Sequence, residues 1–317
     1  MEPIRRSFTS MGTVVRLIAA PESDRRTVER ALAVIRRVFA REDARFSRFR
    51  ADSELSRVNA MAGSWTHVTH PFATLTEVAL RAARETDGLF DPTVLPALLA
   101  AGYDRDFAEV VARGDEVDEE LAAIRRDFAA LMIKQSTVCG AWREVELDGT
   151  RLRLPEGAAL DFGGIAKGWT VDLVAPWLSR LPWAIVDAGG DLRLVGDPPE
   201  GWLEIGVEDP EDPGAEALRL RLASGALATS SVTVRAWGQG QHHVIDPRTS
   251  LPAMTSVVQS TVWRRTCAEA EVWSKVALLR GPDVLDRVHG CLVMSTGEVV
   301  TNLAQAPDGD ALDRVPA

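Results

Sequence analysis

The hydrophobic periodicity of the chain changes near Trp183, and this change limits the folds that the chain can adopt. Before Trp183, residues 24–40 and 72–86 carry apolar side chains at helical spacing, and Gly88 is placed to end the second helix. After it come short apolar segments, separated by Gly, Pro and Asp, that predict strands at 184–187, 192–195, 203–207, 218–222 and 257–263. Because helices and strands do not alternate regularly, the pattern favours an α+β fold with mixed β-sheets flanked by helices over a doubly wound parallel sheet.

Further elements extend this pattern to both ends of the chain. The sequence predicts a strand at 13–19, a helix at 267–280 and a last strand near 291–295. A length of 317 residues suits one large domain or two closely packed halves, and we expect a single domain over 1–317. The charged, helical segment 104–133 predicts a peripheral insertion at 104–140, and residues 304–317 are expected to form a loose tail.

Charge and cysteine content exclude several classes of function. The formal net charge of −10 argues against non-specific binding to nucleic acid and against an anionic membrane as partner, although a local site can still bind phosphate. The three cysteines form no CxxC pair, so neither a zinc site nor a disulfide framework is indicated. No apolar run has the length of a signal peptide or a membrane span, and we therefore expect a cytoplasmic protein.

Lysine is rare in this chain. Only Lys134, Lys167 and Lys275 stand among 36 basic residues, and the others are arginines. Because an ammonium group is a compact point charge and a guanidinium is a planar fork, the two side chains suit different sites. Each lysine is therefore more informative here than in an average sequence. The alternative is that the low number of lysines arose by chance.

The segment Asp161-Phe-Gly-Gly-Ile-Ala-Lys167-Gly168 has the composition of an anion-binding turn. Its glycines allow close approach to the backbone, and a helix is predicted to begin near Lys167. Free amides at the N-terminus of a helix stabilise an anion, and Lys167 would add a positive charge. The segment matches neither the Walker A loop nor GxGxxG, and a tight turn with a surface lysine is the equally open alternative.

Two other segments could contact a ligand. Gly189-Gly190 follows a predicted strand and suits close backbone approach, although a plain hairpin turn explains it as well. His242 and His243 lie in a predicted strand that ends at Asp-Pro, so their side chains should face opposite ways and cannot easily share one metal. His243 could bind a ligand or transfer a proton, but a structural histidine is the more common outcome.

The predicted helix at 267–280 carries Glu271 and Lys275 four residues apart, which places them on one face. They could form a solvated ion pair worth about 0.3–0.5 kcal/mol. They could instead form a polar pair directed at a phosphate or a metal. Trp273 and Ala277 lie off this face and are expected to pack in the interior.

Taken together, these segments resemble the ApbE family of FAD:protein FMN transferases. Each motif is weak alone, but they occur through most of the chain in the order of the family. The matching segments are Met11-Gly12-Thr13, Arg45–Asn59, Gly88–Val94, Asp161–Gly168, Gly189–Asp191, His243–Thr249 and the helix that carries Glu271. The resemblance implies an ApbE-like fold with an FAD cleft between two halves. It also implies that FMN is attached through its phosphate to a Thr or Ser of a target protein, with release of AMP, usually with Mg²⁺ bridging phosphate oxygens.

The resemblance also implies the roles of individual residues. The implied cofactor contacts are Met11, Phe49, Ala100, Ala101, Gly102, Asp161, Lys167 and Ile245, the last through its backbone. Residues at the family's metal positions are Gly164, through its carbonyl, and Glu271, Ser274 and Lys275 on the late helix. His243 and Lys275 are implied as catalytic residues. FAD is the implied substrate, and a Thr- or Ser-containing protein is the implied acceptor.

The chain departs from the family pattern where a metal would bind. Glu271 stands where the family has aspartate, and Lys275 stands where it has threonine. An ammonium group has no acceptor lone pair and cannot ligate Mg²⁺. We therefore predict that Lys275 occupies or crowds one metal position and contacts the pyrophosphate directly. Phe49 replaces a tyrosine, and Ser250 replaces a glycine after Pro-Arg-Thr.

Three functions are compatible with the sequence. The first is FMN transfer to a protein. The second is FAD binding without transfer, and the third is FAD pyrophosphatase activity that gives FMN and AMP. Because Lys275 alters the metal position, it increases the weight of the second and third. The identity of an acceptor protein and the oligomeric state are not encoded in any motif of the sequence.

Overall fold

A computed structural model describes residues 2–112, 139–212, 214–237, 241–303 and 312–314. The chain divides into two compact units, each assembled from segments that are distant in sequence. Unit 1 comprises Met1–Asp43, Ile165–Ser231 and Thr255–Ala317, and unit 2 comprises Ala44–Gly164 and Val232–Met254. The single-domain organisation stays a prediction. Of the expected insertion, helix α5 (Phe107–Ala112) is described, and residues 113–138 lie outside the described residues.

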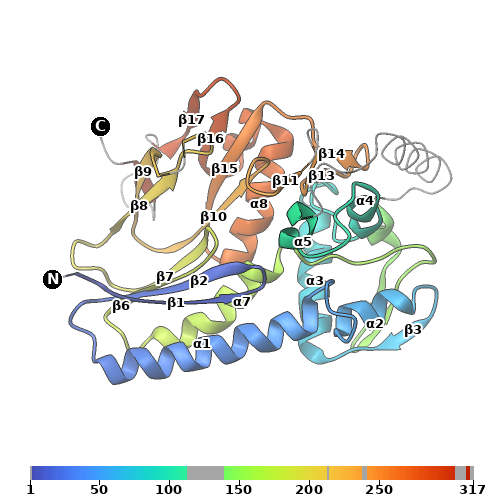
Figure 1. Ribbon diagram of the computed structural model, residues 1–317, viewed down its shortest axis with the longest axis horizontal. Coiled ribbons are helices and arrows are strands. Elements are labelled where there is room, and N and C mark those ends of the chain that lie inside the picture. Colours follow the sequence, from blue (N-terminus) through green and yellow to red (C-terminus); the bar gives the residue numbers. More distant parts are fainter. Residues whose placement is uncertain (1, 113–138, 213, 238–240, 304–311, 315–317) are drawn as a thin grey trace. The chain divides into compact units, whose positions relative to one another are not determined.

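Unit 1 is built on an eight-stranded sheet with the order β1-β2-β6-β7-β10-β15-β16-β17 (Figure 1). Its strands are β1 (Ile4–Ser10), β2 (Thr13–Ala19), β6 (Trp183–Ala188), β7 (Asp191–Gly196), β10 (Gly225–Ser231), β15 (Val257–Arg264), β16 (His289–Met294) and β17 (Val299–Thr301). Every neighbouring pair in this sheet is antiparallel. The α+β class is thus confirmed, but the sheet is antiparallel where mixed sheets were predicted, because no helical crossover returns a strand in the same direction.

Both faces of this sheet are covered. Along β6, Ala184 and Val186 point into a core with helices α1 (Arg25–Phe46), α7 (Ala166–Val174) and α8 (Cys267–Arg280). Trp183 and Ile185 point into a second core. That core includes residues of β8 (Leu203–Glu208) and β9 (Glu216–Leu222), which form a three-stranded sheet with β18 (Leu312–Arg314). Successive residues of a strand point to opposite faces, so β6 is apolar from Trp183 to Val186.

The motif Met11-Gly12-Thr13 forms the turn of the β1–β2 hairpin. Ser10 pairs with Thr13, which leaves Met11 and Gly12 as a two-residue loop with φ of 51° and 66°. Positive φ at both loop positions is the geometry that joins twisted antiparallel strands. Gly12 adopts it easily, whereas Met11 is strained, and such strain is found most often at functional sites.

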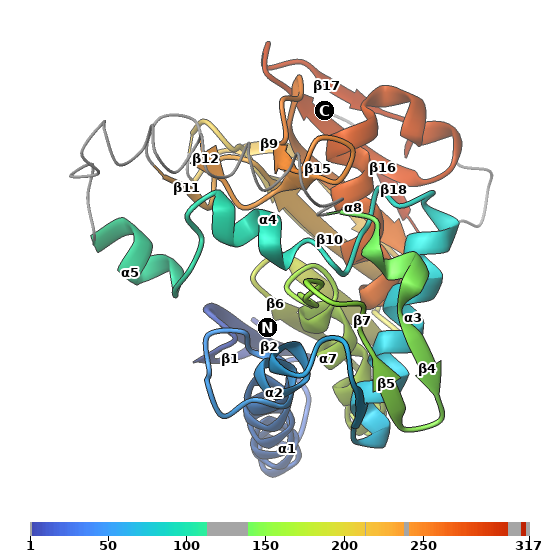
Figure 2. The ribbon, with the colours of Figure 1, turned by 90° about the vertical axis from the view of Figure 1, so that its right-hand side faces the viewer.

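Unit 2 combines helices with small antiparallel sheets. The helices are α2 (Glu54–Ala60), α3 (His70–Glu85), α4 (Leu95–Ala100) and α5. One sheet has the order β3-β5-β4, with β3 (Trp65–His67), β5 (Arg151–Arg153) and β4 (Glu146–Asp148), the last two visible as neighbours in Figure 2. Two further antiparallel pairs join β11 (Ala236–Trp237) with β12 (Gln241–His242) and β13 (Ile245–Asp246) with β14 (Leu251–Pro252).

Short 3₁₀ helices complete the two units at Ala141–Glu144 (η1), Ala175–Leu178 (η2) and Pro282–Asp286 (η3).

Two short strands, β12 and β13, replace the single strand that was predicted around the histidines. Between them the backbone turns, because the amide of Val244 donates a hydrogen bond to Nδ1 of His242 at 3.3 Å. The tail that was expected to be loose contains β18, which pairs with β9.

Among the described helices, none is long and apolar enough to cross a membrane. No disulfide bond joins Cys139, Cys267 or Cys291, all of which lie among the described residues.

Candidate functional site

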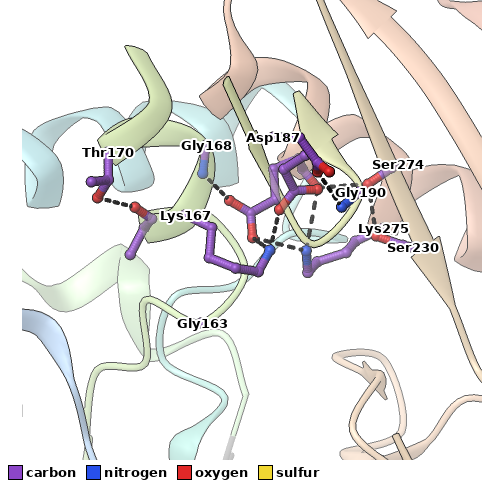
Figure 3. Close-up of polar contacts among 12 residues, drawn as sticks. Gly163, Lys167, Gly168, Thr170, Asp187, Gly190, Ser230, Ser274 and Lys275 are labelled. Atoms are coloured by element: carbon purple, nitrogen blue, oxygen red, sulfur yellow. Dashed lines mark hydrogen bonds and ion pairs between the residues drawn. The ribbon is translucent and has the colours of Figure 1, made fainter. Parts of the chain in front are cut away.

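The carboxylate of Glu271 is the centre of a buried charged cluster in unit 1. Lys167 donates from Nζ to Oε1 of Glu271 at 2.9 Å, and the amide of Gly168 donates to Oε2 at 2.8 Å. The sequence predicted an anion at the N-terminus of α7, and in the structure the chain supplies that anion itself. Figure 3 shows Lys167 and Lys275 approaching the carboxylates from α7 and α8. The predicted i,i+4 pair is present, with Lys275 Nζ at 3.5 Å from Oε1 of Glu271.

Asp191 completes this cluster as its second carboxylate. It is the first residue of β7, and its Oδ2 accepts a hydrogen bond from Lys167. The turn before it is fixed because the amide of Gly190 donates to Oδ1 of Asp187 at 2.8 Å (Figure 3). Asp191 ends a glycine motif in the sequence but had no predicted role. A sequence search for carboxylates at strand or helix ends that could pair with the rare lysines would have identified Asp191.

Burial distinguishes the lysines of the cluster from its carboxylates. The solvent-exposed fractions of the Lys167 and Lys275 side chains are 17% and 20%, whereas those of Asp191 and Glu271 are 1% and 0%. Glu271 is therefore not a solvated helix residue, and the weak surface pair considered from sequence is excluded. The cluster carries two positive and two negative groups, and the lysines form its accessible side. Such a surface suits an anionic ligand.

The environment changes the protonation equilibria of the cluster. Burial would lower the pKa of Lys167, but Asp191 and Glu271 together outweigh burial and raise it well above its ordinary value. Burial raises the pKa of Asp191 to about 6, with Lys167 opposing and Glu271 adding to this shift. For Glu271, burial acts upward, but the two lysines lower its pKa overall. Burial lowers the pKa of Lys275, and Glu271 opposes that shift.

The first turns of α7 and α8 are in close contact. A β-carbon on Gly168 would lie 2.5 Å from the carbonyl oxygen of Cys267 and 2.8 Å from the amide nitrogen of Ala268. Both are backbone atoms that cannot move aside independently. The absence of a side chain at Gly168 thus lets α7 approach α8 closely enough for its amide to reach Glu271.

Asp172 of α7 holds the N-terminus of α8. Its carboxylate accepts from the amides of Cys267 at 2.9 Å and Ala268 at 3.0 Å, and Arg193 donates to it at 2.5 Å. These amides belong to the first turn of α8, which has no partner within its own helix for them. Thr266 caps the same turn through its side chain. Asp172 was not identified from sequence, because its partners lie 95 and 96 residues away.

Replacing Asp172 by asparagine is expected to lower the free energy of unfolding by about 1–2 kcal/mol. The amide side chain can accept only through its single oxygen, and it removes a negative charge from the N-terminus of α8. Urea denaturation measures the change, with Asp283→Asn as an exposed control. Equal losses in the two variants would contradict this role for Asp172.

Ser274 lies one helical turn after Glu271 on α8 and is enclosed by other groups. Its side chain is fully buried, its hydroxyl is 2.7 Å from that of Ser230, and it donates to the carbonyl of Glu271 at 2.9 Å. Figure 3 shows Ser230 and Ser274 side by side. A metal-ligand role for Ser274 stays a prediction.

Unit 2 has a second polar centre at Asp161. Its Oδ2 is 3.1 Å from Nε of Arg48, and its Oδ1 accepts from the amide of Gly163 at 2.8 Å. The side chain of Asn59 accepts from the amide of Leu160, the residue before Asp161, at 2.8 Å and donates to its carbonyl at 2.9 Å. The amide of Asp161 donates to the carbonyl of Pro92 at 2.8 Å. Three sequence motifs therefore converge on Asp161, which explains their occurrence together.

Aromatic packing fixes the segment that carries Asp161. The ring of Phe162 lies 5.5 Å from the ring centroids of both Phe46 and Phe72. All three side chains are buried. Because Phe162 is anchored in this core, the neighbouring carboxylate of Asp161 has little freedom to move.

Arg48 links Asp161 to a group of aromatic rings. Its guanidinium lies 4.4 Å from the ring centroid of Phe49 and 4.2 Å from that of Tyr103, and it donates to the carbonyl of Tyr103 at 2.7 Å. The ring centroid of Trp237 lies 5.3 Å from that of Tyr103. The side chains of Arg48 and Asp161 are almost fully buried. Phe49 is one of the cofactor contacts predicted from the sequence, whereas Arg48 and Tyr103 had no predicted role.

Arg48→Lys is expected to destabilise the protein by about 1–2 kcal/mol, because an ammonium group cannot stack on two rings and donate as a planar fork. Chemical denaturation measures this loss. Arg50→Lys is the matched control, since Arg50 is exposed and pairs with exposed Asp52. If Arg48→Lys is as stable as this control, the stacked geometry of Arg48 has no energetic role.

The other predicted residues lie in the two units as follows. Met11 is in unit 1, in the β1–β2 turn beside the helical core. In unit 2, Trp237 donates to the carbonyl of Ala101 at 3.2 Å, and Ile245 packs in the same apolar cluster as Tyr103. Ala100 is the last residue of α4, and Gly102 has a φ of 91°. Gly164 lies in the turn before α7. The backbone amide of His243 donates to the carbonyl of Arg235 at 3.2 Å. Their roles toward a cofactor stay predictions.

Two details of the histidine motif have a structural explanation. His242 is buried, with Nε2 at 3.0 Å from the carbonyl of Ala253 and Nδ1 accepting from Val244, so it is a structural residue. Burial lowers its pKa, against the hydrogen bond with Ala253. Ser250 has φ of 59°, a left-handed conformation that explains why the family pattern has glycine there.

The residues around Glu271 do not fit a divalent cation. Both carboxylate oxygens already accept from Lys167 or Gly168, and Lys275 adds a second positive charge beside Oε1. Mg²⁺ requires oxygen ligands in near-octahedral geometry, and an ammonium group offers none. In the part of the chain that the structure describes, no group of three or more His, Cys, Asp or Glu side chains could hold a metal ion.

Comparisons with known proteins identify the family of this chain. The family model described as "ApbE family" matches residues 11–290. The FAD:protein FMN transferase of Vibrio cholerae is 31% identical over 97% of this chain and 89% of its own length, and that of Treponema pallidum is 28% identical over 86% and 77%.

Solved structures show the same fold. The crystal structure of the ApbE protein from Thermotoga maritima has a TM-score of 0.80 at 25% identity, covering 95% of this chain and 97% of that one. The flavin transferase ApbE from Vibrio cholerae has a TM-score of 0.72 at 26% identity, with the same coverage. Since the family model spans nearly the whole chain and the α+β fold is shared, this chain belongs to the ApbE family.

Proposed function

We propose that this protein is an FAD:protein FMN transferase. The hydroxyl oxygen of a Thr or Ser on a target protein attacks the phosphorus of the FMN half of FAD. A new phosphoester bond forms, the pyrophosphate bond breaks, and AMP leaves with the bridging oxygen. The hydroxyl proton passes to a base. The observation that carries the proposal is the cluster of Lys167, Lys275, Asp191 and Glu271, formed from family motifs.

The cluster supplies what phosphoryl transfer requires, which is positioned positive charge. Charge develops on the phosphate oxygens and on the leaving AMP, and fixed cations stabilise it. Lys167 and Lys275 are held by buried carboxylates, so their ammonium groups need little reorganisation. We assign them to the pyrophosphate. Since the residues around Glu271 do not fit Mg²⁺, the proposed reaction has no step through a metal at this position.

The cofactor roles of unit 2 residues are proposed from the family motifs that carry these residues. Phe49 offers an exposed ring beside Arg48, which suits stacking with a flavin or adenine. Asp161 is a rigid acceptor for a hydrogen bond from the cofactor. His243 is the proposed base for the acceptor hydroxyl, because imidazole transfers protons near neutral pH. The identity of the acceptor protein and the cytoplasmic location stay predictions.

Incubation of the protein with FAD and an acceptor peptide that contains threonine tests the proposal. Mass spectrometry should show addition of FMN to the acceptor, and chromatography should show an equal amount of AMP. Free FMN with AMP would instead indicate a pyrophosphatase, and unchanged FAD would indicate binding without transfer. Glu269→Gln is a matched control that should keep full activity, because Glu269 is exposed on the same helix as Glu271.

A further inference from the structure

We infer that Lys275 supplies at Glu271 the positive charge that a divalent cation would otherwise bring, and that this protein binds the pyrophosphate of FAD without a metal ion. The inference rests on the proposed function, since it concerns the same ligand. The carboxylate of Glu271 is completely buried and has three donors around its two oxygens: Lys167, Gly168 and Lys275. Its charge is balanced by the chain itself.

The geometry excludes a metal for two reasons. First, a divalent cation at Oε1 of Glu271 would stand beside two ammonium groups and be repelled by both. Second, the nearest hydroxyl on α8, that of Ser274, is enclosed by Ser230 and the carbonyl of Glu271. A cation there would therefore compete with two ammonium groups for Oε1 of Glu271 and with existing hydrogen bonds for the hydroxyl of Ser274. Lys275 has already neutralised the charge that would attract it.

Lys275 remains able to bind a phosphate. Its contacts with Glu271 are long, 3.5 Å to Oε1 and 3.4 Å to the carbonyl oxygen, whereas Lys167 is committed to two carboxylates. An ammonium group has three donors, so Lys275 has hydrogen-bonding capacity left. Its side chain also retains more exposed surface than any other member of the cluster. Figure 3 shows Lys275 extending from α8 toward the carboxylates that Lys167 reaches from α7.

The test measures FAD affinity by flavin fluorescence in excess EDTA and in excess MgCl₂. The wild-type protein is expected to give dissociation constants that agree within about twofold. Lys275→Thr replaces the cation by an oxygen ligand. It should bind FAD at least about tenfold more weakly in EDTA and regain affinity with MgCl₂. Lys275→Arg keeps the charge without an oxygen and should stay independent of Mg²⁺. A wild-type protein that binds FAD only with MgCl₂, or a Thr variant unaffected in EDTA, would overturn the inference.

A second measurement separates this inference from the proposed function. Thermal unfolding without FAD should show no effect of MgCl₂ on the wild-type protein and stabilisation of Lys275→Thr, because a ligand that binds only the folded state raises its stability. Stabilisation of the wild-type protein by Mg²⁺ that is lost in Glu271→Gln would refute metal independence whether or not FAD binds. Failure of FAD to bind in either buffer, with the thermal result as expected, would refute the FMN transferase proposal instead.

Discussion

Replacing Glu271 by glutamine should lower the free energy of unfolding by about 3–5 kcal/mol, the cost of leaving buried charges without their partner. Glutamine keeps the shape of the side chain, and its oxygen can still accept from the amide of Gly168. It cannot balance two ammonium groups. Lys167 would retain its hydrogen bond to Asp191, whereas Lys275 would keep the carbonyl of residue 271 and a shared interaction with the charge of Asp191. The loss of the ion pair of Lys275 is therefore the main cause of the destabilisation.

Urea denaturation of Glu271→Gln and Glu269→Gln measures this effect on one helix. Glu269 is exposed, and its substitution should change stability by no more than about 0.5 kcal/mol. Glu271→Gln should also lose FMN transfer, since both lysines lose their positioning partner. A loss of stability no larger than that of the control would show that Glu271 does not hold the cluster together.

Gly168→Ala is expected to have the second large effect, although alanine normally favours a helix over glycine by about 1 kcal/mol. The added β-carbon would lie 2.5 Å from the carbonyl oxygen of Cys267. Overpacking of this kind costs about 1–3 kcal/mol, and the upper part of that range applies because the obstructing atoms are backbone. The steric cost wins, and we expect a net destabilisation of about 2 kcal/mol.

The functional consequence of Gly168→Ala follows from the same geometry. If α7 moves away from α8, the amide of residue 168 no longer reaches Oε2 of Glu271, and Lys167 moves with it. FAD affinity and stability should therefore fall together in thermal unfolding and fluorescence titration. Gly206→Ala is the matched control, because the nearest obstruction there is the flexible, exposed side chain of Glu216. If Gly168→Ala proves as stable as this control, the close helix contact is contradicted.

Local sequence signals determined several elements fully. The strand at 13–19 and the helix at 267–280 have the predicted bounds. The helix is delimited by local chemistry, since Thr266 caps its first turn and Gly281 follows its last with φ of 77°. Trp273 and Ala277 are buried, as their helical positions predicted.

Other elements gave no local signal. Strand β10 consists mainly of small residues and is buried on both faces, so its sequence has no alternation of polar and apolar side chains. Strand β1 was not predicted because its hairpin turn contains Met11 in place of the usual Asn or Gly. Helix α1 continues to Phe46, beyond the predicted end at residue 40, since no residue there stops it.

The sequence by itself determined the α+β class, the family and the two lysines worth attention, because periodicity, caps and ordered motifs are local or cumulative properties of a chain. Only the tertiary structure decided what those lysines do. Lys167 meets Asp191 and Glu271 across 24 and 104 residues of sequence, and no periodicity encodes such a distance. Burial then decides how much these charges contribute to stability. A Glu-Lys pair on the surface would be weak, but the carboxylate of Glu271 is buried, and a buried charge that loses its partner is strongly destabilising.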